Sequence, residues 1–315
     1  MMNEPLVSIL MPAFNAERFV FEAVESVLNQ SHQHWELLVL NDGSTDKTLS
    51  IIESFNDPRI TLISQQENRG YLESCNHLFS IAKGEFVTFL DADDTHHPER
   101  IMKCLNAFKS NDTLDFITTD FTRINEQNSL VSEHVSKVDY SKYASTPNYQ
   151  PIVCCATIFL RKNLLGIVGG YHPFFKEIGG EDYHWLFELS RNGKGAHLEE
   201  MLYQYRTHND QTHHLNENPL KYFASDILTE IKTSVIAKDI SPLQDESSLK
   251  SWWLDYIKSN TAELEFRKAS SMLNRNEFKK SITHNFSGLL KNPTSFTSWH
   301  RFSYLTYSIL VRWAS

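Results

Sequence analysis

Two aspartates stand at alternate positions directly after a short apolar run. The run Phe86–Leu90 is followed by Asp91 and, two residues later, by Asp93. Because alternate residues of an extended chain face the same side, both carboxylates can point into one site. Paired carboxylates are ligands that Mg²⁺ and Mn²⁺ accept, usually together with substrate phosphates. The competing interpretation is an acidic loop that merely precedes the helix expected from Pro98.

Two further polar loops follow predicted strands. Asp42 stands at a strand end, where its carboxylate can accept a hydrogen bond from a nucleotide base. Arg69 precedes a helix that Gly70 opens, and its side chain could approach a pyrophosphate. The loop after Asp42 also has a purely structural interpretation, in which Gly43 takes a positive φ and Asp46 caps the next helix.

These loops require a regular scaffold, and the first hundred residues predict one. Apolar runs with strand and helix periodicity alternate along the chain, which is typical of a mainly parallel sheet with helices on both faces. In such α/β sheets, ligands gather at the carboxyl ends of the strands. Strands are expected at 7–11, 36–40, 60–64 and 86–90, and helices at 20–28, 46–55, 71–82 and 98–108.

The pattern changes along the rest of the chain. Strand-like runs cover 115–124 and 152–161, a helix is expected at 182–191, and another strand at 198–206. Helical periodicity then dominates. The sequence therefore predicts a nucleotide-binding and catalytic domain over 1–214 and a helical region over 215–315.

Composition and charge restrict the partners. The chain has 315 residues and a net charge of −9. With no strongly basic run, it lacks the cationic surface that nucleic-acid binding needs, so no nucleic acid is expected as a partner. Neither a GxGxxG segment after the first strand nor a GxxxxGK[ST] loop is present. A phosphate ligand is therefore expected to be held through a metal ion.

The sequence also suggests a compartment. Its four cysteines form no CxxC pair and are expected to be buried, reduced thiols. The apolar stretch Leu6–Phe14 has no basic residues before it and contains Pro12, so a strand is favoured over a signal peptide. No apolar run reaches the roughly 20 residues that cross a bilayer. A cytoplasmic protein is expected.

Four segments, in this order, resemble the family 2 glycosyltransferases, which have the GT-A fold. They are Val7–Asn15, Leu38–Asp46, Asn68–Gly70 and Phe89–Asp94. The resemblance covers roughly the first 210 residues. It includes Gly169–Tyr171 and Gly180–Leu186, which look like the acceptor-side loop and the Glu-Asp motif of that family. It carries no functional residue into the helical C-terminal region.

The resemblance implies a nucleotide-sugar site. Asp42 would hydrogen-bond the base, usually uracil, Asp91 would meet the ribose or the metal, and Asp93 would ligate Mn²⁺ or Mg²⁺. His208 is a further metal or diphosphate candidate, because Tyr205–His208 resembles the segment that follows the last core strand. The residues expected to bind the nucleotide are Pro12, Ala13, Phe14, Asn15, Asp42, Asn68, Arg69, Gly70, Asp91 and Ala92.

The resemblance also implies one carboxylate base. The family inverts configuration by a single displacement, so a base must take the proton of the acceptor hydroxyl. Asp182 matches that position, and Glu181 is the alternative because nothing in the sequence separates two neighbouring carboxylates. A structural role, in which both residues only begin a helix, competes with this interpretation.

The leading hypothesis is an inverting hexosyl- or N-acetylhexosaminyltransferase. It would use a nucleotide diphosphate sugar, expected to be a UDP-sugar, and a saccharide or lipid-linked acceptor in cell-surface polysaccharide or glycolipid assembly. One rival is a nucleotidyltransferase, which would carry a glycine-rich, basic loop where this chain has Ala13–Ala16. The other is a non-catalytic nucleotide-sugar-binding module.

The aromatic residues of the C-terminal region allow two interpretations. Trp252, Trp253 and the segment Phe302–Trp313 are most simply packing residues. Alternatively, they support a peripheral contact with the inner face of the membrane, which would suit a lipid-linked acceptor.

Overall fold

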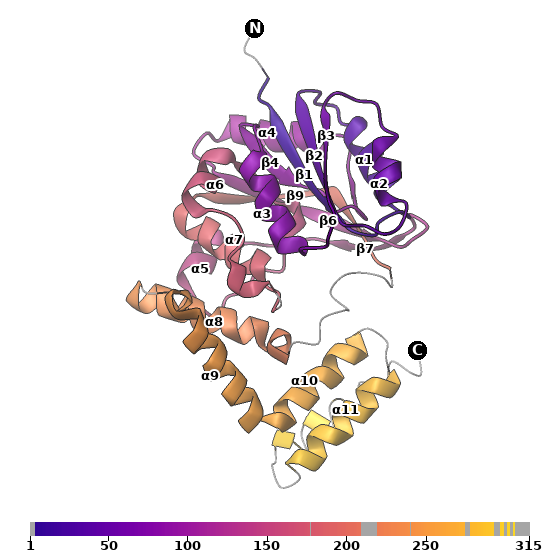
Figure 1. The fold of residues 1–315 in the computed structure, drawn as a ribbon. Coiled ribbons are helices and arrows are strands. Elements are labelled where there is room, and N and C mark those ends of the chain that lie inside the picture. Colours follow the sequence, from indigo (N-terminus) through magenta and orange to yellow (C-terminus); the bar gives the residue numbers. More distant parts are fainter. Residues whose placement is uncertain are drawn as a thin grey trace. The chain divides into compact units, whose positions relative to one another are not determined.

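The chain divides into two compact units, Met1–Leu215 and Asn216–Ser315. The computed structural model describes residues 4–176, 178–208, 219–239, 241–274, 278–292, 297–298, 301–302 and 305. The first unit contains the sheet and its covering helices, and the second is helical (Figure 1).

One mixed sheet forms the centre of the first unit. Its strand order is β3-β2-β1-β4-β8-β6-β9-β5, and β7 also pairs with β6. The first four strands run parallel, whereas β8 is antiparallel to β4 and β6. The strands are β1 (Val7–Ala13), β2 (Trp35–Asp42), β3 (Ile60–Gln65), β4 (Phe86–Phe89), β5 (Thr95–His96), β6 (Phe116–Ile124), β7 (Leu130–His134), β8 (Phe159–Arg161) and β9 (Gly195–Arg206).

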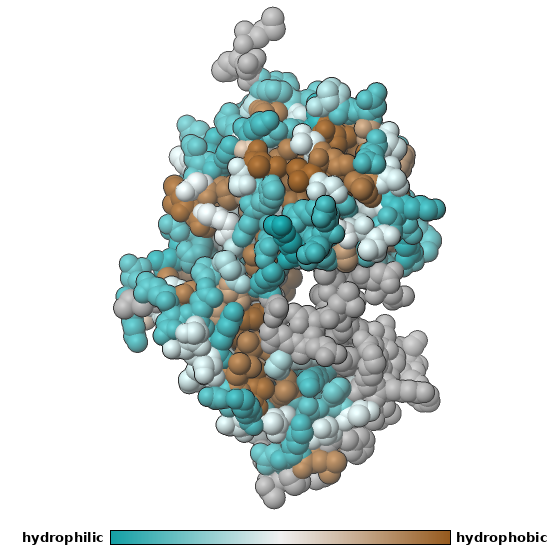
Figure 2. All heavy atoms as spheres, viewed as in Figure 1, coloured by the Kyte–Doolittle hydropathy of each residue, from teal (hydrophilic) through white to brown (hydrophobic). Residues whose placement is uncertain are grey.

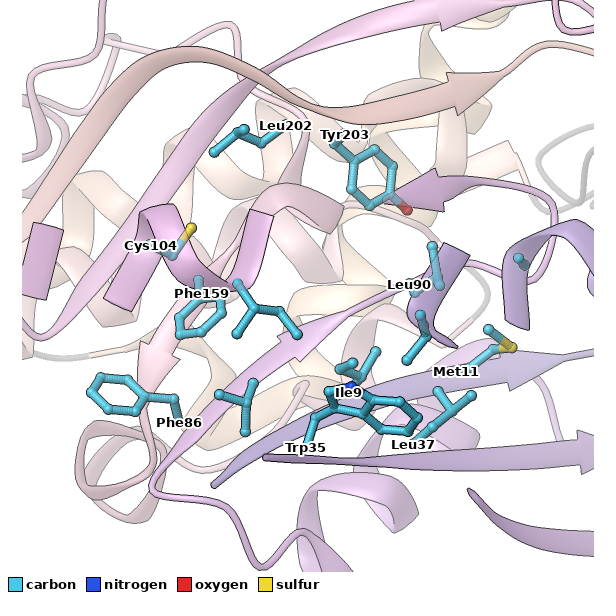
Figure 3. Packing of buried hydrophobic residues seen from close by; sticks show 14 of the residues in the cluster. Ile9, Met11, Trp35, Leu37, Phe86, Leu90, Cys104, Phe159, Leu202 and Tyr203 are labelled. Carbon is cyan, nitrogen blue, oxygen red and sulfur yellow. The ribbon is translucent and has the colours of Figure 1, made fainter. Parts of the chain in front are cut away.

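Helices cover both faces of this sheet, as the alternating pattern predicted. Ile9, Leu37 and Phe159 pack with residues of α1 and α4 into one hydrophobic core (Figure 3). The helix α3 packs against β1 and β2. The helices are α1 (Val20–Leu28), α2 (Thr48–Glu53), α3 (Tyr71–Ile81), α4 (Arg100–Ser110), α5 (Tyr140–Ser145), α6 (Lys162–Val168) and α7 (Glu181–Asn192).

The expected strand over 152–161 is wrong for most of its length. Only Phe159–Arg161 is a strand, and Cys155–Thr157 forms a 3₁₀ turn. Local hydrogen bonds replace ladder bonds there, since Thr157 N–H donates to the Cys154 carbonyl at 3.0 Å and Ile158 N–H to the Cys155 carbonyl at 3.1 Å. Burial therefore explains the apolar pattern that looked like a long strand.

The second unit is helical, as its periodicity predicted. Its main helices are α8 (Ala224–Lys238), α9 (Glu246–Ser259), α10 (Thr261–Asn274) and α11 (Phe278–Lys291). Trp253 is buried, whereas Trp252 is 54% exposed and stacks on Tyr256 with ring centroids 5.7 Å apart. Apolar residues interrupt the hydrophilic surface of this unit (Figure 2). Most of the 302–313 segment lies outside the described residues. No described helix is long and apolar enough to cross a membrane.

Candidate functional site

The parallel strands bring the predicted loops to one edge. The strands β2, β1 and β4 are parallel neighbours, so the residues that follow Ala13, Asp42 and Phe89 lie at the same carboxyl edge. The first two loops are bonded directly to one another. Asn15 N–H donates to Ser44 Oγ at 3.0 Å, and Thr45 N–H donates to Asn15 Oδ1 at 2.8 Å.

The residues at the end of β1 differ in exposure. Pro12 and Ala13 are buried within the strand, whereas Phe14 is 41% exposed and Asn15 is exposed. Asn15 also has a positive φ of 49°, which turns the chain sharply out of the strand. Of the four predicted residues here, Phe14 therefore offers the open side chain, and Asn15 orders the neighbouring loop.

Asp42 holds the third loop in place. Its buried carboxylate accepts the N–H groups of Arg69 and Gly70, both at 2.8 Å. Asn68 and Arg69 are exposed beside it, and Arg69 lines a pocket of about 370 Å³. The structure thus brings the predicted nucleotide loops together, and it gives Asp42 a loop-ordering role that the sequence did not reveal.

Gly43 is needed where these loops meet. Its φ is +69°, and a Cβ atom there would lie 2.7 Å from the backbone N of Asn68. We expect Gly43→Ala to lower the free energy of unfolding by about 2–4 kcal/mol through backbone strain and this clash. Gly169 is the matched control, because its φ is +77° but its Cβ would meet nothing within 4 Å.

Gly169→Ala should therefore cost only the backbone term, about 1–3 kcal/mol for a φ of 77° with a ψ of −168°, a combination essentially confined to glycine. Chemical denaturation of the two variants measures the difference. If both variants lose the same free energy of unfolding, the Asn68 loop does not pack tightly on Gly43.

Asp91 and Asp93 share the predicted exposure, but the aspartate loop is a turn and not extended chain, since Asp94 N–H donates to the Asp91 carbonyl at 3.0 Å. Asp91 and Asp93 are partly exposed, whereas Ala92 and Asp94 are buried. Tyr203 O–H donates to Asp94 Oδ2 at 2.8 Å, and Arg206 N–H donates to Asp94 Oδ1 at 2.7 Å. Asp94 is therefore an internal anchor of this loop, and its two partly exposed neighbours remain the candidate ligands.

The end of β9 supports the aspartate loop from one side. Tyr203 points into the core with its hydroxyl toward the Leu90 end of β4 (Figure 3), where it accepts the Asp91 N–H at 3.2 Å. Arg206 is fully buried, and its Nε–H donates to the Asp93 carbonyl at 2.7 Å. Arg206 also forms an ion pair with Glu22 at 2.8 Å. Its guanidinium therefore has a structural role in holding this loop.

The residues proposed to hold a metal include two that are already adjacent. His208 Nε2 lies 2.9 Å from Asp93 Oδ2. Carboxylate oxygens with one imidazole suit Mn²⁺ or Mg²⁺, and substrate phosphates commonly complete such a coordination shell. Among the described residues, no three acidic, histidine or cysteine side chains already form a metal-binding group. The residues present therefore fit a site that the donor diphosphate would complete.

Glu181 and Asp182 are the first two residues of α7. Burial and the charge of Asp182 raise the pKa of Glu181 to about 7. Burial also raises the pKa of Asp182, against hydrogen bonds from Tyr183 N–H and Cys155 that lower it. The charge of Asp182 thus opposes ionisation of Glu181, and the assignment of the base to one of the two carboxylates remains a prediction.

Asp182 also lies within electrostatic reach of the aspartate loop. Burial, followed by the charges of Asp93 and Asp182, raises the pKa of Asp91 to about 7. The fold thus brings Asp182 near the aspartate loop with Asp91 and Asp93, from which it is far removed in sequence.

An aromatic cluster fixes α7 against the sheet. Tyr171 is buried and stacks on Phe89 at 6.3 Å, and its ring meets the edge of Trp185 at 5.4 Å. Trp185 belongs to α7, and its Nε1–H donates to the Gly169 carbonyl at 2.8 Å. Asn76 of α3 bonds both the N–H and the carbonyl of Tyr171, at 2.7 and 2.8 Å. This cluster connects the predicted acceptor-side loop with the helix that begins at Glu181.

Sequence reasoning missed three residues of this site. Tyr71 contacts Asp91, Tyr203 contacts both ends of the aspartate loop, and Arg206 anchors its middle. Two of them, Tyr203 and Arg206, lie on the predicted strand 198–206, but strict alternation would place positions 203 and 206 on opposite faces. The contacts themselves have no local sequence signal.

Similarity to known proteins identifies the family. The sequence model described as "Glycosyl transferase family 2" matches residues 8–166, half of the chain. The chain belongs to glycosyltransferase family 2. This glycosyltransferase is 30% identical over 275 residues to an uncharacterized glycosyltransferase of Haemophilus influenzae, covering 82% of this chain and 84% of that relative.

A second relative has a more specific name. The Escherichia coli protein WfgD, a UDP-Glc:alpha-D-GlcNAc-diphosphoundecaprenol beta-1,3-glucosyltransferase, is 33% identical over 199 residues, 62% of this glycosyltransferase and 74% of WfgD. Much longer relatives also match, and this chain spans 21% of the Pasteurella multocida chondroitin synthase.

A solved structure has the same fold. TarS 1-349 of S. aureus, in complex with UDP-GlcNAc, superposes with a TM-score of 0.60 at 18% identity, covering 84% of this glycosyltransferase and 80% of TarS 1-349. The predicted GT-A fold with a helical C-terminal region is confirmed. The predicted roles of individual site residues remain predictions.

Proposed function

We propose that this glycosyltransferase moves a hexose or N-acetylhexosamine from a UDP-sugar to a saccharide or lipid-linked acceptor hydroxyl, with inversion, in cell-surface polysaccharide or glycolipid assembly. The main support is the placement of Asp182, which is close enough to Asp91 for its charge to raise the pKa of that carboxyl. A base on one element thus faces the proposed donor carboxylates on another. The name of WfgD, with its UDP-glucose donor and diphosphoundecaprenol-linked acceptor, supports the substrate classes.

The site has a donor side, which would bind the nucleotide sugar, and an acceptor side, which would bind the attacking hydroxyl. Phe14, Asp42 and the 68–70 loop would bind the nucleotide at the carboxyl edge of the sheet. Asp91, Asp93 and His208 would hold Mn²⁺ or Mg²⁺, which when bound supplies charge neutralisation at the leaving diphosphate. The buried bonds from Tyr203 and Arg206 keep this loop fixed, so little reorganisation is needed during the reaction.

On the acceptor side, Asp182 would accept the proton of the attacking hydroxyl. The acceptor oxygen forms a bond to the anomeric carbon while the bond from that carbon to the diphosphate oxygen breaks, releasing UDP. A single displacement from the opposite face inverts the configuration. The charge of Asp182 acts on Asp91, which favours Asp182 as the base. Glu181, whose pKa is raised to about 7 by burial and the charge of Asp182, is the alternative.

The direct test is nucleotide diphosphate release from UDP-, GDP- and dTDP-sugars, with and without Mn²⁺. We expect one UDP-sugar to be turned over, and only with a divalent cation. Product analysis by NMR would give the anomeric configuration. Release of pyrophosphate with synthesis of a nucleotide sugar would instead support a nucleotidyltransferase, and binding without turnover would support a non-catalytic module.

No residue of the second unit has a role in the proposed reaction. A peripheral membrane contact through its exposed aromatic residues stays a prediction. Sedimentation with vesicles that contain anionic lipid would test it.

A further inference from the structure

Tyr71 has a defined position beside Asp42 and Asp91, but it has no role in the proposed reaction. It is the first residue of α3, and it follows Gly70, whose φ is +96° and whose N–H donates to Asp42 Oδ2 at 2.8 Å. Asp42 therefore fixes the backbone from which the Tyr71 side chain projects. The residue is 36% exposed, so part of its surface remains open.

The hydroxyl of Tyr71 contacts a proposed donor ligand. It donates to Asp91 Oδ1 at 3.1 Å. A tyrosine hydroxyl carries its proton at neutral pH, so it acts as the donor to this carboxylate. No other hydrogen bond to the Asp91 side chain is formed within the described ranges. One carboxylate oxygen is thus occupied, and Oδ2 is left for a ligand.

The ring of Tyr71 contacts the acceptor side. It stacks on Tyr171 with ring centroids 6.4 Å apart and an interplanar angle of 21°. Tyr171 is fixed by Asn76 and packs against Trp185 of α7, the helix that begins with Glu181 and Asp182. A single side chain therefore contacts both the Asp91 carboxylate and the loop that supports the proposed base.

We propose that Tyr71 is a positioning residue for the donor, whose hydroxyl holds the Asp91 carboxylate in the orientation that presents Oδ2 to the nucleotide sugar. This inference rests on the proposed function. It explains why an exposed tyrosine stands at the start of α3, where no hydroxyl is needed to cap the helix. Removing the hydroxyl alone should free the carboxylate to rotate and weaken donor binding, while the ring preserves the packing on Tyr171.

Calorimetric titration with UDP in the presence of Mn²⁺ tests this without relying on turnover. We expect Tyr71→Phe to weaken UDP binding about three- to tenfold, the range of one hydrogen bond. In an Asp91→Ala background, Tyr71→Phe should cause no further loss, because the partner of the hydroxyl is gone. A merely structural role would give the same loss in both backgrounds.

Tyr149→Phe is the matched control, since its hydroxyl accepts the Asp139 N–H at 3.2 Å and the residue lies outside the loops proposed to bind the donor. It should bind UDP like the unaltered protein, and thermal unfolding should show all variants folded. If Tyr71→Phe leaves UDP affinity unchanged, or lowers it equally in the presence and absence of the Asp91 side chain, the inference about Tyr71 is wrong and the proposed function still stands. If the unaltered protein does not bind UDP, the proposed function fails and the inference falls with it.

Discussion

Asp182→Asn is expected to lower kcat by about 10²–10⁴-fold, the usual contribution of a general base. The amide keeps the shape of the side chain and cannot accept the proton of the acceptor hydroxyl. UDP binding should be unchanged, because Asp182 belongs to α7 and the nucleotide loops are bonded to one another independently of it. Steady-state transfer kinetics would show the loss of kcat, and a separate measurement of UDP affinity would show that binding is unchanged.

Glu181→Gln is the matched control at the neighbouring carboxylate. It should lower kcat by less than about tenfold if Asp182 is the base. A larger loss in Glu181→Gln than in Asp182→Asn would transfer the role of base to Glu181. Comparable large losses would show that the two carboxylates act as one unit.

The pH dependence follows from the same pair. A base acts when ionised, and burial raises the pKa of Asp182 above that of an ordinary aspartate. The kcat should therefore fall as the pH is lowered, with an acid limb above the ordinary aspartate range of about pH 4. In Asp182→Asn this limb should disappear. If the kcat of Asp182→Asn shows the same acid limb, a group other than Asp182 causes it.

The second large effect is expected at Asp93. Asp93→Ala removes the side chain that already pairs with His208, so Mn²⁺ binding in the presence of UDP should weaken strongly. Turnover of the donor should drop by at least about a hundredfold, because several kcal/mol of charge stabilisation are lost. Paramagnetic resonance of bound Mn²⁺ gives a readout that does not depend on turnover.

Two further variants control this result. Asp112→Ala removes an exposed aspartate from a loop and should leave Mn²⁺ binding unchanged. His208→Ala should weaken binding less than Asp93→Ala, because the carboxylate carries the charge that attracts the cation. Full Mn²⁺ affinity in Asp93→Ala would place the metal elsewhere.

Much of the scaffold could be predicted from local patterns. The four parallel strands and their helices follow from alternating apolar runs, because burial on both faces of a sheet requires continuous apolar segments. Strand alternation also predicted the shared exposure of Asp91 and Asp93, although a turn after β4 and not extended chain produces it. The segment 152–161 was wrongly expected to be one strand, because a buried 3₁₀ turn and a buried strand have the same apolar composition.

The sequence by itself determined which polar residues stand at the strand ends, and parallel pairing then places them at one edge. Only the tertiary structure decided how these residues are held. Tyr203 and Arg206 reach the aspartate loop across more than a hundred residues of chain, and Tyr71 reaches Asp91 from the start of α3. Such contacts depend on which faces meet when the elements pack, and local periodicity carries no information about that choice.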